Sequence, residues 1–168
     1  KGVFEMYSRK GNHIITLKTE HKAVLDACDR VEKMGGEVTY LDVDREGLVN
    51  LEELENAITD KTVLVSVMWA NNETGVVQPI EEMSKIVKEI NPNVLFHSDV
   101  VQAVATKKLN FHNLGIESAA ISGHKIGGPK GIGVMFLKTG YKIPSFLHGG
   151  KQELERRAGT VNVSGVAG

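Results

Sequence analysis

The sequence has little of what disulfide-rich, membrane-spanning or highly charged proteins contain. One residue of 168 is cysteine, Cys28, which excludes an internal disulfide and is typical of a reducing compartment such as the cytoplasm. No apolar run reaches the roughly 18 residues that a membrane-spanning helix needs. The formal net charge of −1 creates no strong field, so we expect neither nucleic acid nor a membrane as a partner.

What remains is the composition of an ordinary globular domain. The hydrophobic fraction of 41% and the charged fraction of 24% are typical of one, and the chain is long enough for a sizeable core. No internal repeat or low-complexity segment is present. The chain begins Lys1-Gly2-Val3 and ends SGVAG, and we expect both ends to be cuts through a longer protein.

Strand-like and helix-like segments alternate along the chain. Runs of β-branched or aliphatic residues predict strands at residues 13–19, 37–43, 63–70, 94–100, 118–123 and 131–137, with a short edge strand at 144–150. Apolar residues at helical spacing predict helices at residues 20–36, 50–58 and 79–90. Asn50 is the expected N-cap of the second helix and Pro79 the first residue of the third.

The first of these helices is expected to bury one face. Its apolar residues at helical spacing are Ala23, Val24, Ala27, Val31 and Met34.

This alternation predicts an α/β fold with a mostly parallel sheet and helices on both faces. Ligands of such sheets bind where the carboxyl ends of the strands meet. Four polar segments follow predicted strands: TEH, WANNETG, HSD and SGHK. We therefore expect these four segments to converge at one edge of the sheet.

The segment HSDVVQ leaves three hypotheses open. His97 and Asp99 have the spacing of two metal ligands on a strand, and His21 or His124 would have to supply a third. Alternatively, Asp99 caps the helix that follows. In the third hypothesis Asp99 binds a protonated heterocyclic nitrogen, with Gln102 beside it.

Two further polar residues have an ordinary structural explanation beside a functional one. Asn72 lies in NNETG, which is typical of a tight turn, and it would otherwise donate a hydrogen bond to a ligand oxygen. His21 stands at the start of the first helix as a surface or capping residue, or it stacks on a flat ligand and transfers protons.

The segment SGHKIGGPKG fits neither nucleotide-binding template. A P-loop needs Ser or Thr after its lysine, and Lys130 is followed by Gly131. A dinucleotide fingerprint needs a helix after the glycines, and a strand is predicted there. Lys125 beside phosphate donors, with Asp99 on a neighbouring strand, is instead the layout of a pyridoxal phosphate site. The alternative for Lys125 is a solvated lysine in a glycine-rich loop.

Taken together, TEHKAVLD, NNETG, HSDVVQA, SGHKIGGPKGIG and GGKQELERRAGTVN closely resemble the cysteine desulfurases. These are pyridoxal phosphate enzymes of the class V aminotransferase-like group, and the resemblance covers nearly the whole chain. It implies the large domain of the aspartate aminotransferase-like fold. Residues 1–168 would be a partial cofactor-binding domain, without the N-terminal segment and without the C-terminal small domain that carries the catalytic cysteine loop.

The resemblance also implies a role for each matched residue. Lys125 would hold the cofactor covalently and His21 would stack on its ring and transfer protons, which makes these two the catalytic residues. Asp99 would face the ring nitrogen and Thr160 would reach the phosphate across a dimer interface. The remaining cofactor-binding residues implied in this way are Asn72, Gln102, Ser122 and His124. Because Lys125 must lose its proton to react, we expect it to be buried beside cations, which lowers the pKa of a lysine.

The implied reaction takes L-cysteine to L-alanine and an enzyme persulfide for iron–sulfur cluster or other sulfur assembly. The implied partners are a second copy of the chain and a sulfur-acceptor or scaffold protein. Cys28 lies in a helix and is expected to be inert, so this piece is expected to be inactive. The alternatives are a selenocysteine lyase or aminotransferase of the same group, a non-catalytic scaffold, and a metal-binding module.

The chain also departs from the family pattern in three places. Lys151 replaces a glycine, Val161 replaces an acidic residue, and Val100 and Val101 are bulkier than usual. A half-exposed cofactor site and exposed apolar patches are expected in a structure of this piece.

Overall fold

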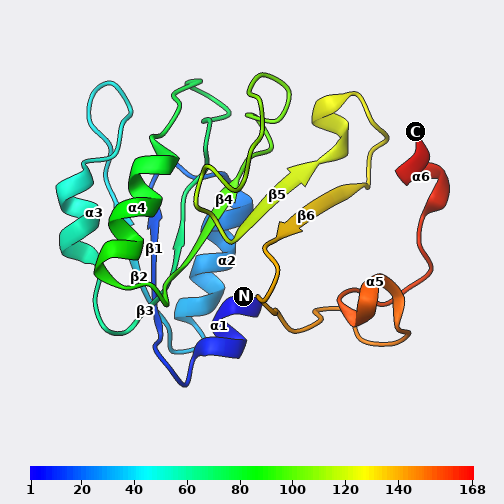
Figure 1. Ribbon diagram of the computed structural model, residues 1–168, viewed down its shortest axis with the longest axis horizontal. Helices are drawn as coiled ribbons and strands as arrows, with labels where there is room; N and C mark the ends of the chain where they lie inside the picture. The colour runs from blue at the N-terminus through cyan, green and yellow to red at the C-terminus, as the bar shows by residue number, and fades with distance from the viewer.

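Six short runs of aliphatic and β-branched residues form one sheet in the computed structural model, which describes residues 1–168 (Figure 1). The strands are β1 (His13–Leu17), β2 (Glu37–Leu41), β3 (Thr62–Ser66), β4 (Leu95–Asp99), β5 (Ser118–Ser122) and β6 (Gly133–Leu137). The helices are α1 (Gly2–Tyr7), α2 (Lys22–Glu32), α3 (Leu51–Ala57), α4 (Ile80–Ile90), the 3₁₀ helix η1 (Gly123–Ile126), α5 (Gln152–Glu155) and α6 (Val163–Ala167).

The strand order in the sheet is β2-β1-β3-β4-β5-β6. All neighbouring pairs from β2 to β5 are parallel, and only β6 runs antiparallel to β5. The predicted mostly parallel α/β fold is therefore confirmed. The parallel pairing places the carboxyl ends of β1, β3, β4 and β5 at a common edge.

Helices cover both faces of this sheet. The larger apolar cluster lies between the sheet and α3 and α4, and includes Phe96 of β4 and Met83 of α4, both fully buried. The smaller cluster lies on the other face and joins Ile14 of β1 to Phe4 of α1 and Val31 of α2. Since both faces are covered, β1 and β3 are buried along their whole length, as their apolar sequences predict.

Caps define where the helices begin. The Asn50 side chain accepts hydrogen bonds from the backbone N–H groups of Glu52 (2.9 Å) and Glu53 (3.4 Å), which confirms it as the N-cap of α3. Pro79 is the N-cap of α4 rather than its first helical residue, so that prediction is wrong by one position. The predicted edge strand at 144–150 is also wrong, because no strand forms there.

The buried face of α2 differs in part from the predicted face. Val31 is buried and Val24 and Ala27 are half-buried, as expected. Ala23 is exposed at the first turn, and Met34 is exposed because α2 ends at Glu32. Helical periodicity does not indicate where a helix ends, and Met34 lies past that end.

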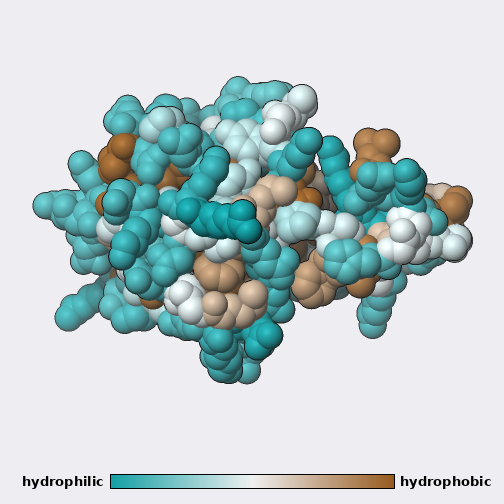
Figure 2. Space-filling model, turned by 90° about the horizontal axis from the view of Figure 1, so that it is seen from below, coloured by the Kyte–Doolittle hydropathy of each residue, from teal (hydrophilic) through white to brown (hydrophobic).

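Beyond η1 the chain exposes large apolar side chains. Val134 and Met135 of β6 are exposed, as are Phe146, Leu154 and Val163 farther along. Hydrophobic surface is also visible at the end of the molecule where α5 and α6 lie (Figures 1 and 2). The expectation of exposed apolar surface is confirmed.

A buried carboxylate joins the amino ends of β4 and β5. Glu117 is only 1% exposed, and its Oε2 accepts a hydrogen bond from the backbone N–H of Phe96 at 2.9 Å. The Nζ atoms of Lys88 and Lys138 lie 2.8 and 3.5 Å from its two oxygens. Two cations and a backbone donor thus offset the cost of removing this charge from water.

We predict that Glu117→Ala lowers the free energy of unfolding by about 3 kcal/mol, because it leaves Phe96 N–H without an acceptor and two lysines without a counter-ion. Urea unfolding followed by Trp69 fluorescence measures the change. Glu81→Ala, which breaks the exposed pair with Lys85 (3.0 Å), is the matched control and should cost less than about 0.5 kcal/mol. Equal losses in the two variants would contradict the role assigned to Glu117.

Candidate cofactor site at the carboxyl edge of the sheet

The four polar segments follow strands that end at the carboxyl edge of the sheet, and hydrogen bonds connect these strand ends. The Asn71 side chain after β3 donates to the carbonyl oxygen of Thr19 after β1, at 2.9 Å. The backbone N–H of Trp69 donates to the carbonyl oxygen of Asp99 at 2.9 Å, and that of Val100 donates to Ala120 at 3.1 Å. The convergence expected from the sequence is therefore observed.

His21 begins α2 at this edge. It has the extended backbone of an N-cap, and its Nδ1 accepts a hydrogen bond from the backbone N–H of Ala23 at 3.1 Å. In the neutral ring an accepting Nδ1 leaves the hydrogen on Nε2. The imidazole is exposed, so the capping residue also presents Nε2–H to a ligand at this edge.

The loop after β3 divides two roles between adjacent asparagines. Asn71 makes the turn, because its Oδ1 accepts from the backbone N–H groups of Glu73 and Thr74, both at 2.9 Å. Gly75 completes the turn with φ of 76°. Asn72 is exposed, and its side chain makes no hydrogen bond within the chain. The turn explanation therefore belongs to Asn71, and the Asn72 amide remains available to a ligand.

Asp99 is half-buried at the end of β4. Its Oδ1 accepts from the backbone N–H of Val101 at 2.9 Å, and Oδ2 has no partner in the chain. The residues it caps, 101–106, form turns instead of the expected helix. Gln102 lies half-buried within these turns. The expected helix cap is therefore wrong: Asp99 closes a turn through Oδ1 and still offers Oδ2 to a positively charged group.

Lys125 lies in η1, directly after β5. The hydroxyl group of Ser122 and Nδ1 of His124 are hydrogen-bonded at 2.7 Å, just before it in the sequence. Gly127 ends η1 with φ of 86°, a conformation that favours glycine. Lys125 and His124 are exposed, in a site that was expected to be half-exposed in this piece.

Thr160 does not follow any of the strands that end at this edge. It is exposed between α5 and α6, in the C-terminal segment that follows β6. Its role at the phosphate site of a second copy of the chain stays a prediction.

Glu20 is a residue of the site that the sequence reading missed. Its side chain is buried at 5% exposure, and Oε1 accepts from the backbone N–H of Met68 at 2.7 Å. Oε2 is buried without a hydrogen-bond partner. Burial and the negative charge of Asp99 raise the pKa of Glu20 to about 8, against the opposing effect of the Met68 hydrogen bond. Its place beside His21 was the available signal.

No third metal ligand lies beside His97 and Asp99. Nδ1 of His97 is hydrogen-bonded to the hydroxyl group of Ser118 at 2.8 Å, and burial lowers the pKa of His97 to about 4. No three His, Cys, Asp or Glu side chains in the chain are arranged to hold a metal ion. None of the helices has the length and apolar character that crossing a membrane requires.

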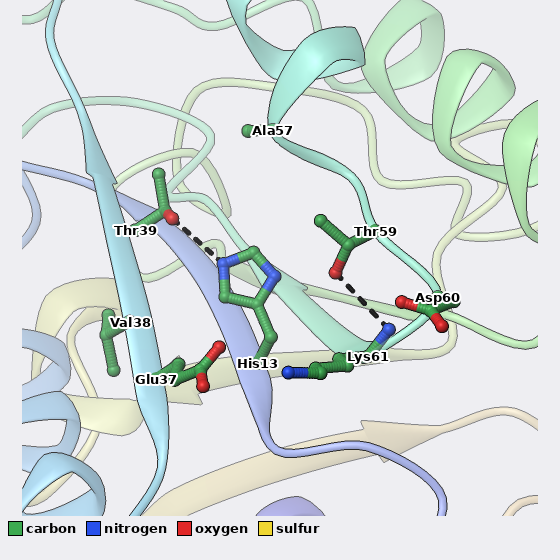
Figure 3. A pocket seen from close by; sticks show the side chains of 8 residues that line it. All are labelled: His13, Glu37, Val38, Thr39, Ala57, Thr59, Asp60 and Lys61. Atoms are coloured by element: carbon green, nitrogen blue, oxygen red, sulfur yellow. Dashed lines mark hydrogen bonds between the residues drawn. The ribbon is translucent and has the colours of Figure 1, made fainter.

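A hollow of about 450 Å³ lies at the opposite edge of the sheet, where the strands begin (Figure 3). His13 points into it, and its ring nitrogens are hydrogen-bonded to the hydroxyl groups of Thr62 (2.7 Å) and Thr39 (2.9 Å). Burial lowers the pKa of His13. With both nitrogens engaged by hydroxyl groups the ring has a structural role, so we do not assign the site to this hollow.

Comparison with known proteins identifies the family of the chain. The family model described as aminotransferase class V matches residues 2–168. The chain belongs to the class V aminotransferase family. Its enzymes, the cysteine desulfurases among them, depend on pyridoxal phosphate.

Individual members of this family are close in sequence and structure. The chain is 49% identical to the cysteine desulfurase IscS of Dictyoglomus turgidum over 168 residues, which are 100% of this chain and 42% of that protein. A solved NifS-like protein is 41% identical with a TM-score of 0.96, covering 98% of this chain and 45% of that one. SspA in complex with cysteine is 34% identical with a TM-score of 0.93, over 99% and 48%. The chain thus spans about two fifths of its curated relatives.

The donor set of this class V aminotransferase chain fits pyridoxal phosphate. Ser122 and His124 supply a hydroxyl group and an imidazole to an anion. Asp99 retains an unpartnered Oδ2 for a cationic ring nitrogen. Lys125 provides an accessible amine on the same loop as the anion ligands. The donors Ser122 and His124 suit the negative phosphate group, and the carboxylate of Asp99 suits a positive ring nitrogen.

Cys28 is buried in α2 and is the only cysteine. Burial raises the pKa of its thiol to about 11. We predict that Cys28 resists a thiol-specific alkylating reagent at neutral pH until the chain unfolds, because the thiolate is the reactive form. Mass spectrometry of alkylated protein, with and without urea, measures this. Rapid labelling of the folded chain would contradict the assignment of Cys28 as an inert core residue.

Proposed function

We propose that this chain is the central part of the cofactor-binding domain of a pyridoxal phosphate-dependent cysteine desulfurase. The observation that carries the proposal is the placement of Asp99 and Lys125 at the carboxyl ends of adjacent parallel strands, β4 and β5. A carboxylate for the ring nitrogen and an amine for the aldehyde are the two groups that the cofactor needs from the protein. The desulfurase relatives support the choice of reaction.

Asp99 supplies the electrostatic part of the mechanism. Pyridoxal phosphate, when bound, withdraws electrons from the α-carbon of an amino acid through its protonated ring. The free Oδ2 of Asp99 would hold the proton on the ring nitrogen, because a carboxylate stabilises a neighbouring cation. The hydrogen bond from the backbone N–H of Val101 to Oδ1 keeps the carboxyl group oriented.

Lys125 and His21 are the proposed catalytic residues. Lys125 would hold the cofactor through its amino group and take up or release a proton at Nζ during the reaction. His21 would lie against the cofactor ring, with Nδ1 fixed by Ala23 so that Nε2 is the atom that donates a proton. Asn72 and Gln102 would bind oxygen atoms of the cofactor or substrate.

Ser122 and His124 would bind the phosphate group of the cofactor. Thr160 would complete the phosphate site of a second copy of the chain, so we propose a homodimer. The long exposed side chains of the C-terminal segment, such as Phe146 and Leu154, are consistent with contacts to other protein surfaces.

L-Cysteine is the proposed substrate of the whole protein, with L-alanine and an enzyme persulfide as products. The structural neighbour solved in complex with cysteine supports this choice. We propose a sulfur-acceptor or scaffold protein as partner, iron–sulfur cluster or other sulfur assembly as the purpose, and the cytoplasm as the location. Because Cys28 is buried, the persulfide would form on a cysteine outside these 168 residues.

Lysine substitution tests the proposal directly. When pyridoxal phosphate is added to the chain, we expect the absorption band of lysine-bound cofactor, and Lys125→Ala should abolish it. Borohydride reduction followed by peptide mass mapping should locate the cofactor on Lys125. The matched control is Lys130→Ala, an exposed lysine of the same loop, which should retain the band. Equal labelling of Lys125 and Lys130, or an unchanged band in Lys125→Ala, would refute the assignment.

A further inference from the structure

Two glutamates are buried in this chain, and only one of them has a cation beside it. Glu117 is paired with Lys88 and Lys138. Glu20 forms no ion pair, and its single hydrogen bond joins Oε1 to the backbone N–H of Met68 at 2.7 Å. Its Oε2 is buried without a partner. A carboxylate in such surroundings loses its hydration with only one hydrogen bond as compensation, so the environment favours the uncharged acid.

The ionisable groups that face Glu20 do not change this conclusion. Asp99 at the end of β4 carries a negative charge that opposes a second one on Glu20, and the two come from different strand ends. Cys28 of α2 also interacts with Glu20, and each would disfavour the ionised form of the other. No cation contributes to the shift, which places the pKa of Glu20 at about 8.

Glu20 also connects the parts of the candidate site. Its backbone lies between Thr19, which accepts from Asn71, and His21, which caps α2. Its Oε1 holds the N–H of Met68, and the next residue of that segment, Trp69, donates to the carbonyl oxygen of Asp99. One carboxyl group therefore fixes the ends of β1 and β3, and through Trp69 it reaches the end of β4.

We propose that Glu20 is a positioning residue that carries a proton at neutral pH, so that Asp99 remains the only negative charge beside the cofactor. This inference rests on the proposed function, since it assigns Asp99 to a protonated ring nitrogen. Glu20 itself touches neither substrate nor cofactor in this account. It holds the strand ends through Oε1, and above its pKa it releases its proton to solvent and adds a second negative charge to the edge.

The protonation of Glu20 can be tested without the cofactor. Infrared spectroscopy of the full chain should show the carbonyl stretch of a protonated carboxyl group at pH about 7, disappearing with a midpoint of about 8. The band should be absent in Glu20→Gln, which retains an oxygen acceptor for Met68, and retained in the control Glu89→Gln, an exposed residue of α4. Labelling glutamate carboxyl groups with ¹³C shows in the wild type whether the band belongs to a glutamate, and Glu20→Gln then assigns it to Glu20.

Stability gives a second, independent measurement. The unfolded chain ionises Glu20 near pH 4.5 and the folded chain near 8, so the folded state binds the extra proton between these values. The free energy of unfolding of the wild type should therefore fall, relative to Glu20→Gln, as the pH rises from about 4.5 to about 8. A flat difference, or an infrared midpoint near 4.5, would overturn the proposal.

Cofactor binding separates this inference from the proposed function. With pyridoxal phosphate bound, ionised Glu20 should help cationic groups of the site to keep their protons. The absorption band of lysine-bound cofactor changes when the group that joins Lys125 to the cofactor loses its proton at high pH. We expect the proton affinity of this group to be about threefold lower in Glu20→Gln than in the wild type. An identical titration overturns the proposed effect of the Glu20 charge on the cofactor and leaves the assignment of Lys125 intact. Failure of the wild type to form the band refutes the proposed function, while the infrared titration still decides whether Glu20 is protonated.

Discussion

The parallel register of β1, β3, β4 and β5 is the constraint on which the candidate site depends. Ser66 of β3 is paired with His97 of β4, and Asp99 of β4 with Ala120 of β5, so each strand ends within two or three residues of its neighbour. Every segment that follows a strand then starts at the same edge of the sheet. An antiparallel β4 would carry Asp99 to the edge where Glu117 lies and would leave Lys125 without a carboxylate.

The fold could be predicted from local sequence because both faces of the sheet are covered. Continuous aliphatic runs identify β1 and β3, and Asn50 marks the start of α3 through its cap. The predicted strands were too long at their carboxyl ends, where residues such as Met68 leave the ladder to bind the side chains of other loops. The edge strand predicted at 144–150 does not form, because extended residues become a strand only where a neighbouring strand offers free backbone N–H and C=O groups.

Site residues could be predicted where their residue type is unusual for its position in the sequence. They could not be predicted where burial in the fold changes the protonation of a side chain. Lys125 and Asp99 were found because lysine and aspartate at the ends of buried strands suggest a ligand. Glu20 escaped notice because glutamate is normally exposed, and nothing in the sequence shows that α2 and the end of β3 enclose it. Asn71 and Asn72 are equivalent in sequence, and only the turn geometry distinguishes them.

The two buried glutamates show why the two edges of the sheet differ in function. At the amino edge two lysines pair with Glu117, and this arrangement holds β4 and β5 together. At the carboxyl edge the protein places no cation beside Glu20, although Lys18 is only two residues away and pairs outward with Asp42 instead. A cation beside Glu20 would favour the ionised carboxylate of Glu20 and would compete with a ligand for the carboxylate of Asp99. Because no cation lies beside Glu20, the negative charge of Asp99 remains available to a positively charged ligand.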